Sequence, residues 1–180
     1  SRPPACPSGG SCFGHPPPGR ISLMVSMPSF RRLAGRILAG VTLSGVLSAI
    51  YVQGSHAWVL GFVMLVPWLR TLDTRASLPG ALMSAWLMSV AFTAAAFWWF
   101  GLAIGDYTQV GGPNGLAVLL LMAPFFQPQF LAFSLVRHLA GQRHGPVVRA
   151  LAGAAAWVGA EWALPKVLGD TLGYGLYPSA

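Results

Sequence analysis

The sequence predicts an all-α integral membrane protein, a helical bundle of about five transmembrane helices preceded by a disordered N-terminal tail. The first observation behind this is composition: 54% of the 180 residues are hydrophobic, 8% are charged, and the mean hydropathy is +0.61. A soluble domain has about 25% charged residues. The second observation is that long apolar runs follow one another with short polar links between them. Most of the surface is therefore expected to face lipid.

Residues 1–30 are expected to form a disordered N-terminal segment, and residues 31–180 the transmembrane helical domain. Proline, glycine and serine dominate the first 26 residues, and such a segment has too little apolar surface to offset the entropy cost of ordering. Cys6 and Cys12 lie here, at a C-x5-C spacing that fits no metal site. We interpret them as thiols without a functional role.

The start of the chain suggests a second hypothesis about this segment. The chain begins with Ser1, whereas Met24 and Met27 each precede a basic stretch and then a hydrophobic run. The first two dozen residues are therefore expected to lie upstream of the true start, which N-terminal sequencing of the expressed protein would settle.

The first two apolar runs cover residues 37–52 and 56–69. Arginines precede the first run, so a signal peptide is the alternative interpretation. We favour a first membrane helix because the run is long, no small-x-small cleavage site ends it, and further apolar runs follow. The second run has 14 residues, fewer than the roughly 20 needed for a full crossing. It is expected to thin the bilayer locally or to form a short hairpin with the first.

The remaining three runs cover residues 78–104, 115–136 and 147–164. The third run is the longest and carries an aromatic cluster at residues 97–100, typical of the headgroup region. The fourth contains two prolines and two glutamines, which predict a kinked helix with its polar face against protein. The fifth is rich in alanine and glycine, which favours close helix packing.

The basic residues predict the orientation. Ten of the eleven lie in three segments that five crossings place on one side: the N-terminal segment, residues 70–75 and residues 137–149. The positive-inside rule then puts the N-terminus in the cytoplasm and the C-terminus outside. Nucleic-acid binding, the other partner that a net charge of +7 suggests, is not favoured, because the charges sit between apolar runs and form no patch with aromatics.

Few residues offer chemistry. Of the four carboxylates, Asp73 is interpreted as a solvated loop charge, while Asp106 and Asp170 are placed in the outer loop and tail. Glu161 lies within the fifth run, where an ionisable group is costly and tends to be functional, although exposure near the outer end would relieve that cost. The sequence contains no nucleophile motif, no phosphate loop and no histidines at metal-ligand spacing.

Two stretches carry a family resemblance: AFWWFGLAIGDYTQVGGPNGLAVLLLMAPFFQPQFLAF (96–133) and AAAWVGAEWALPKVLGDTLGYGLYPS (154–179). Their order of an aromatic helix end, a Gly-Gly-Pro loop, a long apolar helix and a Glu-Trp pair resembles the bacterial apolipoprotein N-acyltransferase family over residues 33–180. The resemblance implies a multi-pass enzyme of the bacterial inner membrane. It would move an acyl chain from a membrane phospholipid to the N-terminal amino group of a diacylated lipoprotein cysteine, without a cofactor or metal.

In that family a nitrilase-like domain outside the membrane supplies a Glu-Lys-Cys triad that forms a thioester. No residue of this chain maps onto the triad, since Lys166 is the only lysine and both cysteines precede the membrane region. We therefore expect an N-terminal fragment, or a truncated gene product, that is inactive alone and has no catalytic residue of its own.

By the same resemblance the outer ends of the third and fifth runs would border the lipid entrance. The candidate lipid-positioning residues are Trp98, Trp99, Asp106, Tyr107, Glu161 and Trp162. Two alternatives remain open: a transport or channel subunit that uses the kinked fourth helix and Glu161 as a polar path, and a small membrane scaffold without chemistry.

Overall fold

A computed structural model describes residues 27–53, 58–73 and 77–164. Residues 1–26 of the expected disordered segment, with its two cysteines, and the C-terminal residues with Lys166 and Asp170 lie outside the described residues. The first helix begins at Met27, within the segment assigned above to the disordered domain.

Most of the described residues are helical, and no strand occurs among them. The elements in order are α1 (Met27–Gln53), the 3-10 helix η1 (Trp58–Phe62), α2 (Val66–Asp73), α3 (Leu78–Tyr107), α4 (Gly112–Phe126), α5 (Pro128–Gly141) and α6 (Pro146–Ala163). The all-α class predicted from composition is therefore confirmed.

Two helices are long and apolar enough to cross a membrane, namely α1 over Ala34–Gln53 and α3 over its full length. A third span results if α4 and α5, which meet at a bend of 43°, are counted as one broken span. Within the described part of the chain, α2 and α6 do not meet this test by themselves. The expected count of about five spans is thus not confirmed.

The second apolar run, expected as one span over residues 56–69, forms η1 and the short helix α2, separated by a turn. An eight-residue helix is too short to cross a bilayer alone. Pro67 suits the first turn of α2 because it lacks an N–H. The N–H of Trp68 donates to Ser44 Oγ of α1 at 3.0 Å, which satisfies a donor that the start of a helix leaves unpaired.

The fourth apolar run, expected over residues 115–136, is broken at Gln127 between α4 and α5. Pro124 lies inside α4 and Pro128 begins α5, and each proline removes a hydrogen bond to a carbonyl one turn earlier. The side chains of Gln127 and Gln129 are 3% and 7% exposed, and Gln129 Nε2 donates to Gln127 Oε1. The predicted kink and the inward-facing glutamines are confirmed.

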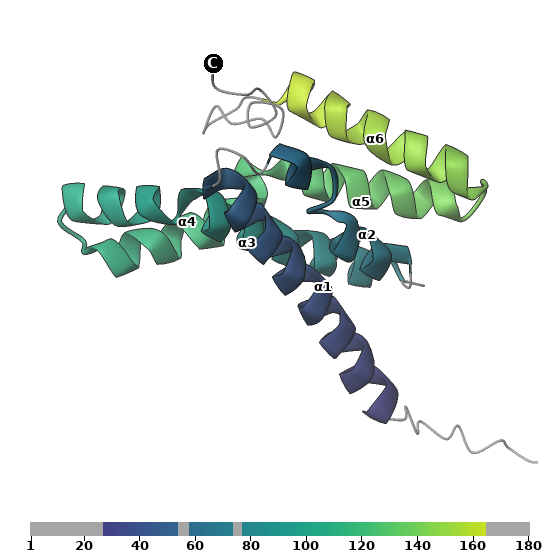
Figure 1. Cartoon of the computed structure of the whole chain (residues 1–180), viewed down its shortest axis with the longest axis horizontal. Coiled ribbons are helices and arrows are strands. Elements are labelled where there is room, and N and C mark those ends of the chain that lie inside the picture. Colours follow the sequence, from purple (N-terminus) through teal and green to yellow (C-terminus); the bar gives the residue numbers. More distant parts are fainter. Residues whose placement is uncertain (1–26, 54–57, 74–76, 165–180) are drawn as a thin grey trace, which may run out of the picture.

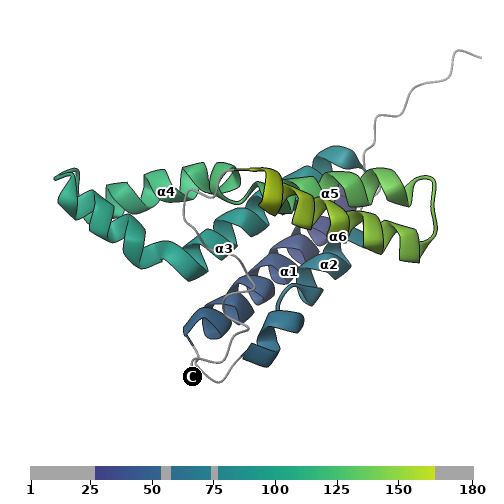
Figure 2. The ribbon, with the colours of Figure 1, turned by 90° about the horizontal axis from the view of Figure 1, so that it is seen from above.

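The helices are arranged around α3, the longest of them (Figure 1). α4 returns along the C-terminal half of α3, α5 continues toward the opposite end, and α6 doubles back along α5. Both views place the α3–α4 turn and the α5–α6 loop at opposite ends of the molecule (Figure 2). α1 and α2 pack together beside α3. A set of rings and hydroxyls holds these pieces together.

Phe130 of α5 is the centre of the core and is fully buried. Its ring centroid lies 5.5 Å from that of Trp68 on α2, 5.6 Å from Phe92 on α3 and 4.9 Å from Trp157 on α6. Phe133 adds ring contacts to Trp68 and Trp157. These five residues, here called the Phe130 ring cluster, join α2 and α3 to α5 and α6, which lie much later in the sequence.

Hydroxyl groups satisfy the buried polar atoms around α2. Trp68 Nε1 donates to Ser84 Oγ of α3 at 3.2 Å. Ser48 Oγ donates to the carbonyl oxygen of Ser44 at 2.8 Å within α1. In an apolar environment a hydrogen bond between two helices, such as those of Trp68 to Ser44 and Ser84, contributes about 0.6 kcal/mol to stability. Trp68 therefore connects α2 to α1 and α3 through its two N–H groups, and to α5 through its ring.

Candidate functional site

Glycine brings α3 and α4 into backbone contact, and together their residues 96–126 form what is here called the α3–α4 arm. A Cβ placed on Gly115 would lie 2.6 Å from the Gly105 nitrogen, and one on Gly101 would lie 2.8 Å from the Leu116 Cα. At the tip, Gly111 has φ +90°, a backbone conformation that side chains disfavour, and its N–H donates to the Gly105 carbonyl at 3.0 Å. The arm is therefore a close-packed hairpin.

Four of the six predicted lipid-positioning residues lie on this arm. Trp98 and Trp99 are 48% and 56% exposed and sit about 13 Å short of the end of α3, at ~1.5 Å rise per residue. Trp99 packs against the neighbouring Phe100 ring with centroids 5.8 Å apart. Asp106 is exposed and Tyr107 is 90% exposed, at the tip of the arm. Large apolar rings therefore project outward from this hairpin.

The other two predicted residues lie at the end of α6. Trp162 is 89% exposed. Glu161 is partly buried, and its Oε1 accepts a hydrogen bond from Trp157 Nε1 at 3.1 Å, one helical turn earlier. Because Trp157 belongs to the Phe130 ring cluster, this bond ties the Glu161 carboxyl to the core. Accepting this hydrogen bond from the Trp157 indole is a structural role that accounts for a carboxylate at this position.

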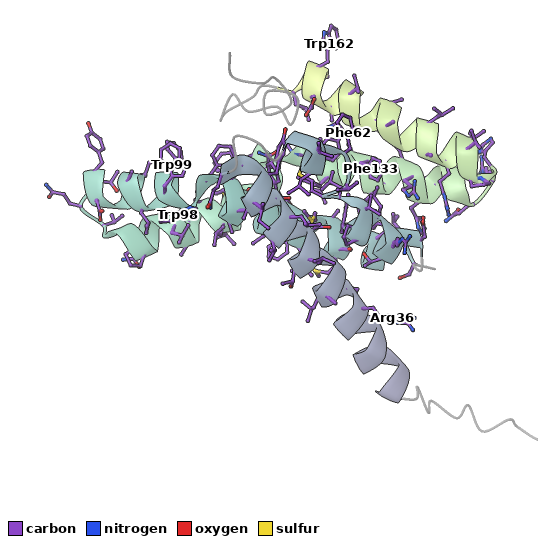
Figure 3. The ribbon with its side chains drawn as sticks, viewed as in Figure 1. Arg36, Phe62, Trp98, Trp99, Phe133 and Trp162 are labelled. Atoms are coloured by element: carbon purple, nitrogen blue, oxygen red, sulfur yellow. The ribbon has the colours of Figure 1, made fainter. Side chains whose placement is uncertain are left out.

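The six residues form two separate groups. Trp98 and Trp99 lie on the arm, well apart from Trp162 at the end of α6 (Figure 3). Among the described residues, no hydrogen bond or ring contact connects the two groups. The structure therefore does not gather the predicted residues into one pocket. Four of the six lie together on the α3–α4 arm.

Sequence reasoning missed a charged cluster at the opposite end of the bundle. Asp73, at the end of α2, was interpreted as a solvated loop charge. Instead, its Oδ1 accepts from Arg137 Nη2 at 2.6 Å and lies 3.2 Å from Arg149 Nη2. Arg137 comes from the end of α5 and Arg149 from the start of α6. Both partners are more than sixty positions away from Asp73 in the sequence, so no local motif could have revealed the cluster.

Side chains around this cluster fix the two guanidinium groups. The Arg137 Cζ lies 5.8 Å from the centroid of the Phe133 ring, in a cation–π position. The stem of Arg149 crosses Gly141, where an added Cβ would lie 2.9 Å from Arg149 Cδ. A cavity of about 140 Å³ adjoins the cluster and is lined by, among others, Ser134, His138 and Gln142.

No three histidine, cysteine, aspartate or glutamate side chains gather into a metal-binding group within residues 27–53, 58–73 and 77–164. The described residues present three candidate features: the α3–α4 arm with its exposed tryptophans, the buried break between α4 and α5, and the cavity beside Asp73, Arg137 and Arg149. None of these is a nucleophile system.

Comparison with known proteins gives one match. The model of the apolipoprotein N-acyltransferase N-terminal domain matches residues 44–180, well over half of the chain. No curated protein and no solved structure matches the chain. The matched region includes the α3–α4 arm, the helix break and the basic cluster. With its apolar helices, the chain is a membrane protein, and it belongs to the apolipoprotein N-acyltransferase family through that family's N-terminal domain.

Proposed function

We propose that this chain is the membrane part of an apolipoprotein N-acyltransferase, which transfers an acyl chain from a phospholipid to the N-terminal cysteine of a diacylated lipoprotein in the bacterial inner membrane. The family membership supports this reaction class. The chain's own contribution would be to bind and orient the acyl chains of the lipid substrates.

The exposed tryptophan pair of the α3–α4 arm is the observation that supports this role. Trp98 and Trp99 are adjacent, and each leaves about half of its surface uncovered. Indole rings combine a large apolar body with one N–H donor, which suits the boundary between acyl chains and headgroups. The close glycine contacts between α3 and α4 hold the two helices together, so the arm would offer acyl chains a rigid surface.

A photo-crosslinking experiment tests the role of the arm. The 180-residue chain is placed in liposomes containing phospholipid with a diazirine at the end of one acyl chain, and crosslinked peptides are mapped by mass spectrometry. The double variant Trp98→Ala/Trp99→Ala is expected to lower crosslinking to the arm about fivefold, because each lost aromatic contact contributes roughly 0.5–1.5 kcal/mol. An excess of diacylated lipopeptide should compete in the wild type.

Trp86→Ala is the matched control, since Trp86 lies on the same helix, is 38% exposed, and is located toward the other end. It should leave crosslinking to the arm unchanged. Equal crosslinking in the wild type and the double variant, or no competition by the lipopeptide, would reject the proposed substrate contact.

We also propose five crossings with the N-terminus in the cytoplasm, the second crossing being made by η1 and α2 together. Two features support this topology. The basic cluster joins α2, α5 and α6 at one end of the bundle, and the α3–α4 turn lies at the opposite end (Figures 1 and 2). Arg36 lies on the N-terminal half of α1, at the end of that helix farther from the tryptophan pair (Figure 3).

Cysteine labelling in inside-out and right-side-out vesicles tests this topology. In a variant lacking Cys6 and Cys12, Val110→Cys in the α3–α4 turn should react with a membrane-impermeant maleimide only from outside, and Arg143→Cys in the α5–α6 loop only from the cytoplasmic side. Both positions are exposed. Labelling of both from the same side would overturn the topology.

A transport role draws support from the broken helix, since discontinuous helices often line substrate paths. The two glutamines at this break, however, are buried and bonded to each other. The family match also points to acyl transfer. The lipid-binding role is therefore favoured.

A further inference from the structure

The cavity beside Asp73, Arg137 and Arg149 has the character of an anion site. It has a volume of about 140 Å³, well above the roughly 10–15 Å³ that one water molecule requires. It is lined by residues of four helices, α2, α3, α5 and α6, and Asp73 is the only carboxylate among them. Two guanidinium groups against one carboxylate leave an excess positive charge at its wall.

Three polar atoms of residues that line the cavity have no hydrogen-bond partner within the described part of the chain. Asp73 engages both arginines through the same oxygen, Oδ1. The Nε atoms of Arg137 and Arg149 are buried and have no hydrogen-bond partner. Ser134, which is 1% exposed, also lines the cavity, and its Oγ has no partner. Buried polar atoms are nearly always paired in proteins, so these residues retain hydrogen-bonding capacity that the acceptor oxygens of a ligand would satisfy once the side chains turn toward it.

Two further polar side chains, which are bonded to each other, also line the cavity. Gln142 Nε2 and His138 Nε2 lie 3.1 Å apart on adjacent turns at the end of α5, and both line the cavity. The ion pairs alone do not explain the arrangement, because the Asp73 side chain is 41% exposed and partly exposed ion pairs contribute little to stability. Planar guanidinium groups match the oxygens of a phosphate particularly well.

We propose that this cavity binds a phosphate group, supplied by the headgroup of an anionic phospholipid in the adjacent leaflet or by free phosphate. A basic pocket between helices at the membrane surface is a recurrent way of holding an anionic headgroup. The site lies at the end of the bundle opposite the tryptophan pair (Figures 1 and 3). It is therefore distinct from the arm and does not depend on the acyl-transfer proposal.

Retention of lipid, measured by native mass spectrometry, tests the site. The purified 180-residue chain is equilibrated with mixed micelles of phosphatidylglycerol or phosphatidylcholine. The wild type should retain phosphatidylglycerol preferentially. Arg149→Gln should weaken that retention about tenfold, because it removes a charged donor while leaving the Arg137–Asp73 pair intact. Arg143→Gln, an equal charge change at an exposed position of the neighbouring α5–α6 loop, should have no effect.

Asp73→Asn separates a binding site from a purely structural cluster. Removing the carboxylate raises the positive charge of the cavity, so phosphate retention should increase several-fold. If the three residues only fasten the helices together, Asp73→Asn and Arg149→Gln would both lower the Tm and neither would change lipid retention. That outcome, or weaker retention in Asp73→Asn, would overturn the proposal.

Inorganic phosphate is the second probe and identifies the source of the ligand. A Tm that rises with inorganic phosphate in the wild type but not in Arg149→Gln, without preference for phosphatidylglycerol, would support a phosphate site filled from solution. Preferential retention of phosphatidylglycerol would support the lipid headgroup. Absence of both responses would reject a phosphate site of either kind.

Discussion

Phe130→Ala is expected to lower the free energy of unfolding by about 3 kcal/mol, the lower end of the range for buried phenylalanine and tryptophan truncations. Phe130 is fully buried and contacts rings on three other helices. In lipid the unfolded side chain would not face water, so the gain from transfer out of water is small. The loss comes from the cavity and from the ring contacts, each contributing about 0.5–1.5 kcal/mol.

Phe125→Ala is the control for this prediction. Phe125 lies just before the break between α4 and α5, as Phe130 lies just after it, but Phe125 is 75% exposed. Its truncation should therefore change the free energy of unfolding by less than about 0.5 kcal/mol. Unfolding would be followed by the near-ultraviolet signal of the aromatic residues during denaturant titration of the chain in mixed micelles. Equal effects of the two variants would show that the Phe130 ring cluster is not the core of the bundle.

Gly115→Ala is expected to destabilise the α3–α4 arm by about 1–3 kcal/mol, the usual cost of overpacking. The added Cβ would lie 2.5 Å from the Gly101 oxygen and 2.6 Å from the Gly105 nitrogen. These are backbone atoms, which cannot rotate away as a side chain does. The two helices would have to separate, which would also move the tryptophan pair.

The direction of the change in the free energy of unfolding distinguishes Gly115→Ala from an ordinary glycine-to-alanine substitution in a helix. In an unobstructed helix, replacing glycine by alanine stabilises by roughly 0.5–1 kcal/mol. Gly159 in α6 has no atom within 4 Å of an added Cβ, so Gly159→Ala should stabilise the chain. Measured in the same unfolding titration, the two variants should shift stability in opposite directions. Stabilisation by both would show that α3 and α4 are not in backbone contact.

The sequence anticipated those features that depend on local composition. The third apolar run matches α3 closely, because length and hydropathy alone define a spanning helix. The break at Gln127 follows from the missing N–H groups of Pro124 and Pro128. The second run was expected as one span because hydropathy depends on composition alone. It carries no information that the Ser44 hydroxyl of α1 accepts a hydrogen bond from the N–H of Trp68 and so stabilises a new helix start there.

Features that depend on tertiary contacts could not be anticipated in this way. Trp98 and Trp99 were singled out as an aromatic cluster, and the structure leaves them exposed. Glu161 was singled out as a costly charge; its partner Trp157 is a local exception, since it lies one turn earlier on the same helix, at a spacing the sequence already contains. The basic cavity was missed entirely, since its charged residues come from three helices and each appears as an ordinary loop charge in the sequence.

The ion pair between Asp73 and Arg137 has a consequence for biosynthesis. The two residues are 64 positions apart, and membrane chains, like others, emerge from the ribosome N-terminus first. Asp73 therefore has neither of these arginine partners until α5 and then α6 have been made. A carboxylate is costly to bury in lipid, so the end of α2 is expected to stay hydrated until both arginines have been synthesised.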